Sequence, residues 1–175
     1  QFLIDSLSYL KSLGVNAIEL MPVNEFEGNS SWGYNPSFST ALDKYYGTPN
    51  KLKEFIDLCH QNGIAVIMDM VLNHTYGQSP LVRMYWDSAN NRPAANSPWF
   101  NVVSPNPVYS WGYDFNHEKS ATKYFVDRVN RYWLEEYKFD GFRFDFTKGF
   151  TNTPGDGGGF DQARINILKR MANKI

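Results

Sequence analysis

Residues 139–148 read FDGFRFDFTK, and this stretch decides how the rest of the chain is interpreted. Apolar and charged residues alternate with a period of two, which predicts a short buried strand. One face carries three aromatic rings, from Phe142, Phe144 and Phe146. The other face carries Gly141, Arg143 and Asp145. Charged side chains on such a strand are costly unless they are paired. Arg143 and Asp145 are therefore either a structural ion pair, or a pair in which Arg143 holds the Asp145 carboxylate in place for catalysis.

The composition excludes several classes of protein. Apolar residues make up 42% of the 175 residues and charged residues 20%, which is enough apolar surface for a core. The formal net charge of -1 gives no basic footprint, so we expect no nucleic-acid partner. No apolar run is long enough to span a bilayer, so we expect no membrane span. The single Cys59 excludes a disulfide within the chain, and its helical spacing from Phe55 and Ile56 predicts a buried thiol.

Helical and strand patterns alternate along the chain. Helices are expected over residues 2–13, from Thr48-Pro49 to Asn62-Gly63, from about Ser120, and after the glycine-rich loop 151–159. In the last of these helices, four side chains are expected to face the core: Ile165, Leu168, Met171 and Ala172. Strands are expected over residues 15–23, 64–72 and 139–148. Residues 24–47 and 73–118 show no convincing period and are expected to be long loops.

This alternation predicts an α/β fold with a parallel sheet and right-handed crossovers. All the long loops follow strands, so functional residues are expected at the carboxyl ends of the strands, as in (β/α)₈ barrels and doubly wound sheets. No G-x-G-x-x-G follows a strand, which disfavours a dinucleotide-binding fold. Three strands cannot close an eight-stranded barrel, so we expect a piece of a larger domain.

Two side chains near the end of the strand over residues 64–72 are candidates for chemistry. Asp69 shares a face with Ile67 and Val71, and a lone carboxylate on an apolar face needs a partner. Arg143 on the next strand is the expected partner. His74 lies just past the strand end, where a histidine is either structural or part of an active site.

At these positions the chain resembles a known family. Residues 69–74 (DMVLNH) and 141–145 (GFRFD) are similar to the first and second conserved regions of the α-amylase superfamily, glycoside hydrolase family 13. Further resemblances occur in residues 18–23 (IELMPV), 32–34 (WGY), 46–48 (YGT) and 114–116 (DFN). The resemblance implies strands two to four of a (β/α)₈ TIM barrel with flanking helices. Residues 1–74 and 119–175 would belong to the barrel, and residues 75–118 to its inserted domain B.

The resemblance also implies roles for single residues. Asp145 would be the nucleophile that forms a glycosyl-enzyme intermediate, and Arg143 would orient it. His74 and Tyr34 would line the subsite for the sugar under attack, His74 by hydrogen bonding and Tyr34 by stacking. Asp69 would be a buried acid beside Arg143.

Three further positions are implied at the edge of the site. Lys148 would contact the leaving-group side of the substrate, but Gly149 follows it where the family often has histidine. Asn73 matches a calcium-binding position, and Asp114 in domain B would be a second ligand. A strand-capping hydrogen bond is the alternative role for Asn73.

The two long loops contain eleven tryptophan and tyrosine residues, an unusual number for loops: Trp32, Tyr34, Tyr45, Tyr46, Tyr76, Tyr85, Trp86, Trp99, Tyr109, Trp111 and Tyr113. Most are expected to pack domain B against the barrel. The remainder are expected to stack on sugar rings, whose apolar faces suit aromatic side chains.

The expected function is that of a retaining, amylase-type glycoside hydrolase acting on α-1,4-linked glucans such as starch and glycogen. The alternatives are a transglycosylase such as a branching enzyme, or a non-catalytic carbohydrate-binding relative. The family's acid, a Glu, and a further Asp lie beyond these residues, so the 175 residues alone are expected to show no turnover. Open strand edges predict self-association. Glucan degradation favours a secreted or cell-surface enzyme.

Overall fold

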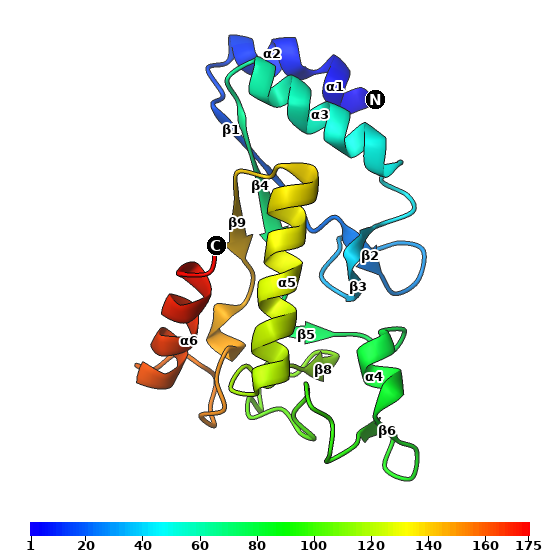
Figure 1. Ribbon diagram of the computed structural model, residues 1–175, viewed down its shortest axis with the longest axis vertical. Coiled ribbons are helices and arrows are strands. Elements are labelled where there is room, and N and C mark those ends of the chain that lie inside the picture. The colour runs from blue at the N-terminus through cyan, green and yellow to red at the C-terminus, as the bar shows by residue number, and fades with distance from the viewer.

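The computed structural model describes all 175 residues (Figure 1). Its helices are α1 (Phe2–Asp5), α2 (Leu7–Ser12), α3 (Pro49–Gln61), α4 (Pro80–Met84), α5 (Ser120–Tyr137) and α6 (Gln162–Ala172), with a 3₁₀ turn η1 (Thr147–Gly149). Its strands are β1 (Ala17–Leu20), β2 (Asn24–Phe26), β3 (Pro36–Leu42), β4 (Ala65–Met70), β5 (His74–Thr75), β6 (Trp86–Asp87), β7 (Arg92–Pro93), β8 (Tyr113–Asp114) and β9 (Gly141–Phe144).

The central sheet has three parallel strands in the order β1-β4-β9, which confirms the predicted parallel sheet. β4 lies in the middle, and its alternate residues Val66, Met68 and Met70 are completely buried. The register of β4 and β9 places Asp69 opposite Arg143. Because the strands are parallel, their carboxyl ends meet at one edge of the sheet.

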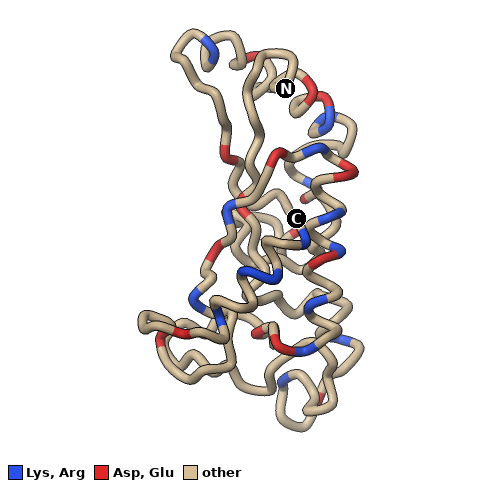
Figure 2. Tube along the Cα trace, turned by 60° about the vertical axis from the view of Figure 1, so that its left-hand side comes forward, with Lys and Arg blue, Asp and Glu red and all other residues tan.

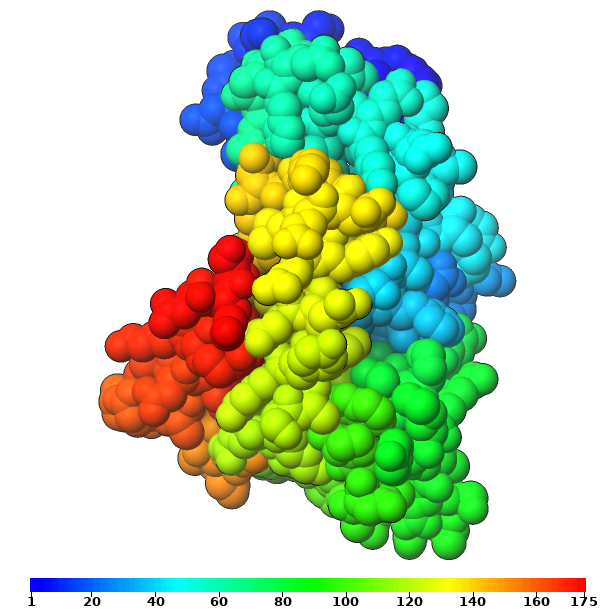
Figure 3. Space-filling view, in the orientation of Figure 1, coloured from blue at the N-terminus to red at the C-terminus, as the bar shows by residue number.

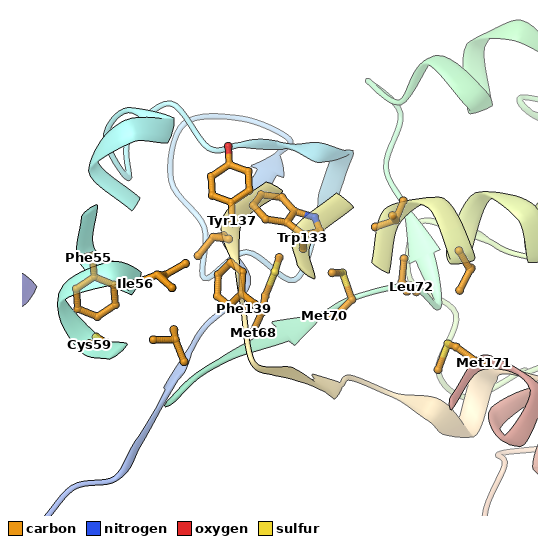
Figure 4. Packing of buried hydrophobic residues seen from close by; sticks show 14 of the residues in the cluster. Phe55, Ile56, Cys59, Met68, Met70, Leu72, Trp133, Tyr137, Phe139 and Met171 are labelled. Carbon is orange, nitrogen blue, oxygen red and sulfur yellow. The ribbon is translucent and has the colours of Figure 1, made fainter. Parts of the chain in front are cut away.

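The main core lies between the sheet and the helices, as Figure 4 shows. α3 contributes Phe55, Ile56 and Cys59, so the predicted burial of the thiol is confirmed. Long α5 contributes Trp133 and Tyr137 and runs alongside the sheet from the end of the molecule opposite α3 toward the α3 end. Thr48 begins α3 as predicted, since its side chain accepts a hydrogen bond from the Lys51 amide.

Two predicted helices differ in detail. The helix expected over residues 2–13 is divided into α1 and α2 at Ser6, whose hydroxyl donates to the Phe2 carbonyl and competes with regular helical bonding. In α6 the prediction of an inward Ala172 is wrong, because Ile167 and Met171 are the buried residues. A two-point ion pair from Arg170 to Asp127 of α5 fixes the rotation of α6.

The predicted long loops are partly regular. Residues 24–47 contain the antiparallel hairpin β2–β3, whose two register shifts and polar side chains hide any period of two. Residues 73–118 contain α4 and four strands of only two residues each, too short for a periodic pattern. These residues form the end of the molecule opposite α1–α3 (Figure 3).

The strand predicted over residues 139–148 is shorter and less buried than expected. β9 ends at Phe144, and Phe146 has a left-handed backbone (φ 46°), so it leaves the face shared by Phe142 and Phe144. β9 pairs only with β4, so one of its edges is open.

The surface carries both signs of charge, interspersed along the chain (Figure 2). This agrees with the net charge of -1. None of the helices is long and apolar enough to cross a bilayer.

Candidate active site

Two carboxylates share one guanidinium at the carboxyl ends of β4 and β9. Arg143 Nη1 donates to Asp69 Oδ1 and Oδ2 at 2.9 and 3.1 Å, and to Asp145 Oδ1 at 2.6 Å. The side chain of Asp69 is 4% exposed, whereas that of Asp145 is 22% exposed. The predicted pairing of Asp69 with Arg143 is confirmed. Asp69 is therefore the buried carboxylate of the pair, and Asp145 is the carboxylate that a ligand can reach.

Tyr34 completes this network from the loop between β2 and β3. Its hydroxyl donates to Asp69 Oδ2 at 2.8 Å. Burial, together with this bond to a carboxylate, raises the pKa of Tyr34 to about 12. Gly33 makes the approach possible, because its φ is 93° and a Cβ there would lie 2.4 Å from the Pro22 carbonyl oxygen.

Asp145 is positioned by the turn that ends β9. Its amide donates to the Met70 carbonyl at 2.9 Å, which extends the pairing with β4 by one residue. Phe146 then takes its left-handed conformation, which is strained for a bulky side chain. Its ring packs edge-on against Tyr109 and Trp111, with centroids 5.5 and 5.2 Å away. The sharp turn is therefore held by aromatic contacts from residues 75–118.

His74 lies beside these carboxylates but is only 3% exposed. Its Nε2 lies 2.9 Å from the Tyr34 carbonyl oxygen and must donate to it, while Nδ1 lies 3.3 Å from the Asn73 side-chain amide. Burial lowers the pKa of His74, so the neutral ring is favoured. Its predicted hydrogen bond to a sugar therefore competes with a bond that the protein already makes.

An open hollow of about 540 Å³ lies over Asp145. Its lining combines carboxylate, amide and hydroxyl groups with aromatic rings: Ser31, Trp32, Tyr34, Asn35, His74, Tyr76, Trp111 and Asp145. Trp32 is 78% exposed at this hollow, and Trp111 is 46% exposed. The arrangement suits a ligand that has both apolar faces and hydroxyl groups, such as a pyranose.

Four of the remaining loop aromatics pack mainly within residues 75–118, rather than against the barrel as the sequence predicts for most of them. In residues 75–118, Tyr85 packs edge-on against Trp99 at 5.6 Å, and Trp86 packs against Tyr113 at 5.4 Å. Trp86, Trp99 and Tyr113 adjoin a small separate core of Val82, Phe100 and Phe115. Local packing thus accounts for part of the aromatic content, and the hollow accounts for another part.

Lys148 and Gly149 lie beyond the lining of the hollow. The Lys148 ammonium lies 5.9 Å from the centre of the Tyr109 ring. Gly149 is buried against Asn73, and a Cβ at this position would lie 1.8 Å from Asn73 Oδ1. The glycine that replaces the family's usual histidine is therefore required by the packing of Asn73.

Asn73 and Asp114 do not by themselves make a calcium site. Asn73 Oδ1 is buried without a hydrogen-bond partner, so it fits the role of an oxygen ligand. Asp114 instead accepts a hydrogen bond from the Asn101 side-chain amide at 2.7 Å. Burial also raises the pKa of Asp114 to about 7. No group of three His, Cys, Asp or Glu side chains is placed to hold a metal. Calcium stays a prediction, and no step below depends on it.

Apart from Asn116, which belongs to the resembling residues 114–116, several residues in and around the site have no recognisable sequence signal. Ser31 and Asn35 line the hollow, and only their position beside Trp32-Gly33-Tyr34 marks them. Three asparagines bond to one another across residues 75–118 and the loop before α6: Asn101, Asn116 and Asn152. His117 is buried against Phe150 with ring centroids 4.0 Å apart. These contacts join segments far apart in sequence, so no local pattern reveals them.

Comparison with known proteins agrees with this geometry. Residues 1–111 match the family model described as "Alpha amylase, catalytic domain". The chain belongs to the α-amylase family. It is 34% identical over 146 residues to malto-oligosyltrehalose trehalohydrolase of Saccharolobus solfataricus, covering 81% of this chain and 23% of that protein. It is 32% identical over 146 residues to 1,4-alpha-glucan branching enzyme GlgB of Saccharophagus degradans, covering 81% of this chain and 18% of that protein.

Solved structures of α-amylase family proteins confirm the fold. A putative alpha amylase from Salmonella typhimurium superposes with a TM-score of 0.69 at 30% identity, covering 98% of this chain and 26% of that chain. Trehalose-6-phosphate hydrolase of Bacillus licheniformis superposes with a TM-score of 0.75 at 23% identity, covering 99% of this chain and 38% of that chain. The three parallel strands are therefore part of a (β/α)₈ barrel. The chain spans about a fifth of the length of the curated relatives above.

Proposed function

We propose that this chain is part of a retaining glycoside hydrolase of the amylase type, acting on α-1,4-linked glucans. The observation that supports this most is the position of Asp145, which a cation holds at a strand end within an aromatic-lined hollow. Residues 75–118 are proposed to be domain B, inserted between the barrel segments 1–74 and 119–175. Trp111 from that segment lines the same hollow.

In this proposal Asp145 attacks the anomeric carbon and forms a covalent glycosyl intermediate. Arg143 binds Oδ1, and no other side chain bonds to the Asp145 carboxylate, so Oδ2 is the oxygen that attacks. Tyr34 stacks on the sugar and also holds Asp69 in place. His74 lines the subsite, and Lys148 contacts the leaving-group side.

The general acid is proposed to come from outside these 175 residues. Retaining glycosidases need a second carboxyl group about 5–5.5 Å from the nucleophile, protonated before the reaction. Asp69 is unsuited to this role because it is buried and accepts hydrogen bonds from both Arg143 and Tyr34.

The test compares the intact protein that contains this chain with its Asp145→Asn variant on a soluble α-1,4-glucan, following the products by proton NMR. We expect α-anomeric products from the wild type and a rate loss of several orders of magnitude in the variant, a barrier increase of at least ~4 kcal/mol. If wild type and variant are equally inert on α-glucans, a non-catalytic carbohydrate-binding role replaces this proposal.

A branching-type transglycosylase is the second candidate, favoured by the match to a glucan branching enzyme. The same spectra separate the two, because transfer creates new α-1,6 signals whereas hydrolysis creates reducing ends. Asp145 is the nucleophile in both cases.

A further inference from the structure

A second hollow, of about 290 Å³, lies in the segment of residues 75–118 next to the candidate active site. Its lining is formed by five residues: Gly77, Val82, Arg83, Trp86 and Tyr113. The first hollow is lined by Tyr76 and Trp111 from the same two stretches of chain. β5 and β8 hold these stretches together, with Thr75 paired to Tyr113. The two hollows are therefore neighbours across the Tyr76–Gly77 peptide.

The second hollow has an aromatic wall and one exposed base. Trp86 and Tyr113 pack edge-to-face at 5.4 Å. Arg83 is exposed, donates through Nε to the Gly77 carbonyl at 3.0 Å, and forms no ion pair. On the other side of Gly77 lies Glu27, whose oxygens would be 3.7 and 3.8 Å from a Cβ at Gly77. Glu27 Oε2 is buried and has no hydrogen-bond partner.

This combination suits a hydroxyl-rich ligand. The exposed Arg83 guanidinium disfavours a cation and supplies donors for hydroxyl groups. The Trp86 and Tyr113 rings supply the apolar surface on which a sugar ring stacks.

We propose that this hollow binds a distant, unreacting part of the α-glucan whose other end lies over Asp145. The inference rests on the proposed function, because the glucan is the ligand that the neighbouring hollow is proposed to hold. Trp86 stacks on one sugar ring, and Arg83 donates to its hydroxyl groups. Long glucans thus gain a contact that short oligosaccharides do not reach.

The test uses the intact protein and three variants: Trp86→Ala, Arg83→Gln and, as a matched control, Tyr85→Ala. Tyr85 is an aromatic residue of the same segment, but it packs on Trp99 and does not line the hollow. KM and kcat are measured on soluble starch and on a short maltooligosaccharide. Binding to starch is measured separately in the inactive Asp145→Asn background by gel retardation.

We expect Trp86→Ala and Arg83→Gln to raise KM on starch and weaken retardation by roughly three- to tenfold, with kcat unchanged. Kinetics on the short substrate should match the wild type, and Tyr85→Ala should match it on both substrates. Normal starch kinetics in both hollow variants of an active enzyme overturn this inference alone. Equal losses on both substrates, or an equal loss in Tyr85→Ala, also overturn it. If neither the wild type nor any variant turns over or binds starch, both this inference and the proposed function are overturned.

Discussion

Tyr34 combines two proposed roles, substrate contact through its ring and positioning of Asp145 through its hydroxyl. Its ring lines the hollow, and its hydroxyl bonds to Asp69, which in turn holds Arg143 against Asp145. Asp145, the proposed nucleophile, is therefore held in part by a residue that it does not touch. The hydroxyl can be removed without removing the ring, which separates the two roles.

We predict that Tyr34→Phe in the intact protein lowers kcat on an α-glucan by roughly 10- to 100-fold, because a hydrogen bond to a carboxylate is lost. KM should change little, since the stacking ring remains. Steady-state kinetics check this, with Tyr45→Phe as a control because Tyr45 is 61% exposed. A raised KM with normal kcat would instead limit Tyr34 to substrate stacking.

His117 is buried outside the hollow, and we expect it to affect stability. Burial lowers the pKa of His117 to about 4, and Nε2 has no hydrogen-bond partner. In the unfolded chain histidine binds a proton near pH ~6.5. Below that pH the unfolded state holds more protons, so the free energy of unfolding falls as pH decreases toward 4.

We predict that His117→Phe removes this pH dependence while the replacement ring still stacks on Phe150. The stability of the variant relative to wild type should improve by about 2–3 kcal/mol between pH ~7 and ~4. Urea unfolding of both proteins at the two pH values measures this difference, in which the contributions of other titrating groups cancel. A difference that stays constant with pH would contradict the prediction.

At the scale of elements, the turn η1 is fixed against the end of β4. Gly149 in this turn touches Asn73, and Phe150 after it is fully buried. We predict that Gly149→Ala destabilises the fold by about 1–3 kcal/mol, because its Cβ overlaps Asn73 Oδ1. Gly159→Ala is the control, since nothing lies within 4 Å of a Cβ there.

Urea unfolding of both glycine variants tests this prediction. The double variant Gly149→Ala with Asn73→Ala should recover part of the loss, because the overlapping atom is gone. Equal unfolding free energies for Gly149→Ala and wild type would show that Asn73 moves freely.

Elements with a strong local pattern could be predicted from the sequence. α3 has a capping Thr48, an apolar stripe and a glycine at its end, and β4 has a continuous apolar run, so both were predicted closely. The β2–β3 hairpin could not be predicted, because its bulged register and polar residues leave no regular alternation. The Asp69–Arg143 pair followed from charge burial, whereas the Tyr34 contact depends on a loop path that no periodicity encodes.

At the scale of the whole molecule, the sheet has two open edges. β1 and β9 each pair only with β4, and several apolar side chains are exposed, among them Phe2 at 81% and Phe160 at 84%. Unpaired strand edges and apolar surface favour association between chains.

We predict that the isolated 175-residue chain self-associates and shows no turnover of α-glucans. Light scattering after size-exclusion chromatography should give a mass that rises with concentration, whereas the intact protein should give a constant mass. A monodisperse 20.2 kDa species at every concentration would contradict the prediction of association.

The pairing of β5 with β8 has a consequence for how this fold diversifies. His74 lies opposite Asp114, so the chain leaves the barrel and re-enters it at neighbouring positions. Loops whose ends lie close together tolerate large changes in length at little entropic cost. The two ends of the segment are thus fixed by β5 and β8 whatever its length, while Tyr109 and Trp111 within it also hold the turn at Phe146. We therefore expect that exchanging residues 75–113 for the corresponding segment of a relative changes ligand preference, provided that the new segment keeps aromatic contacts to Phe146.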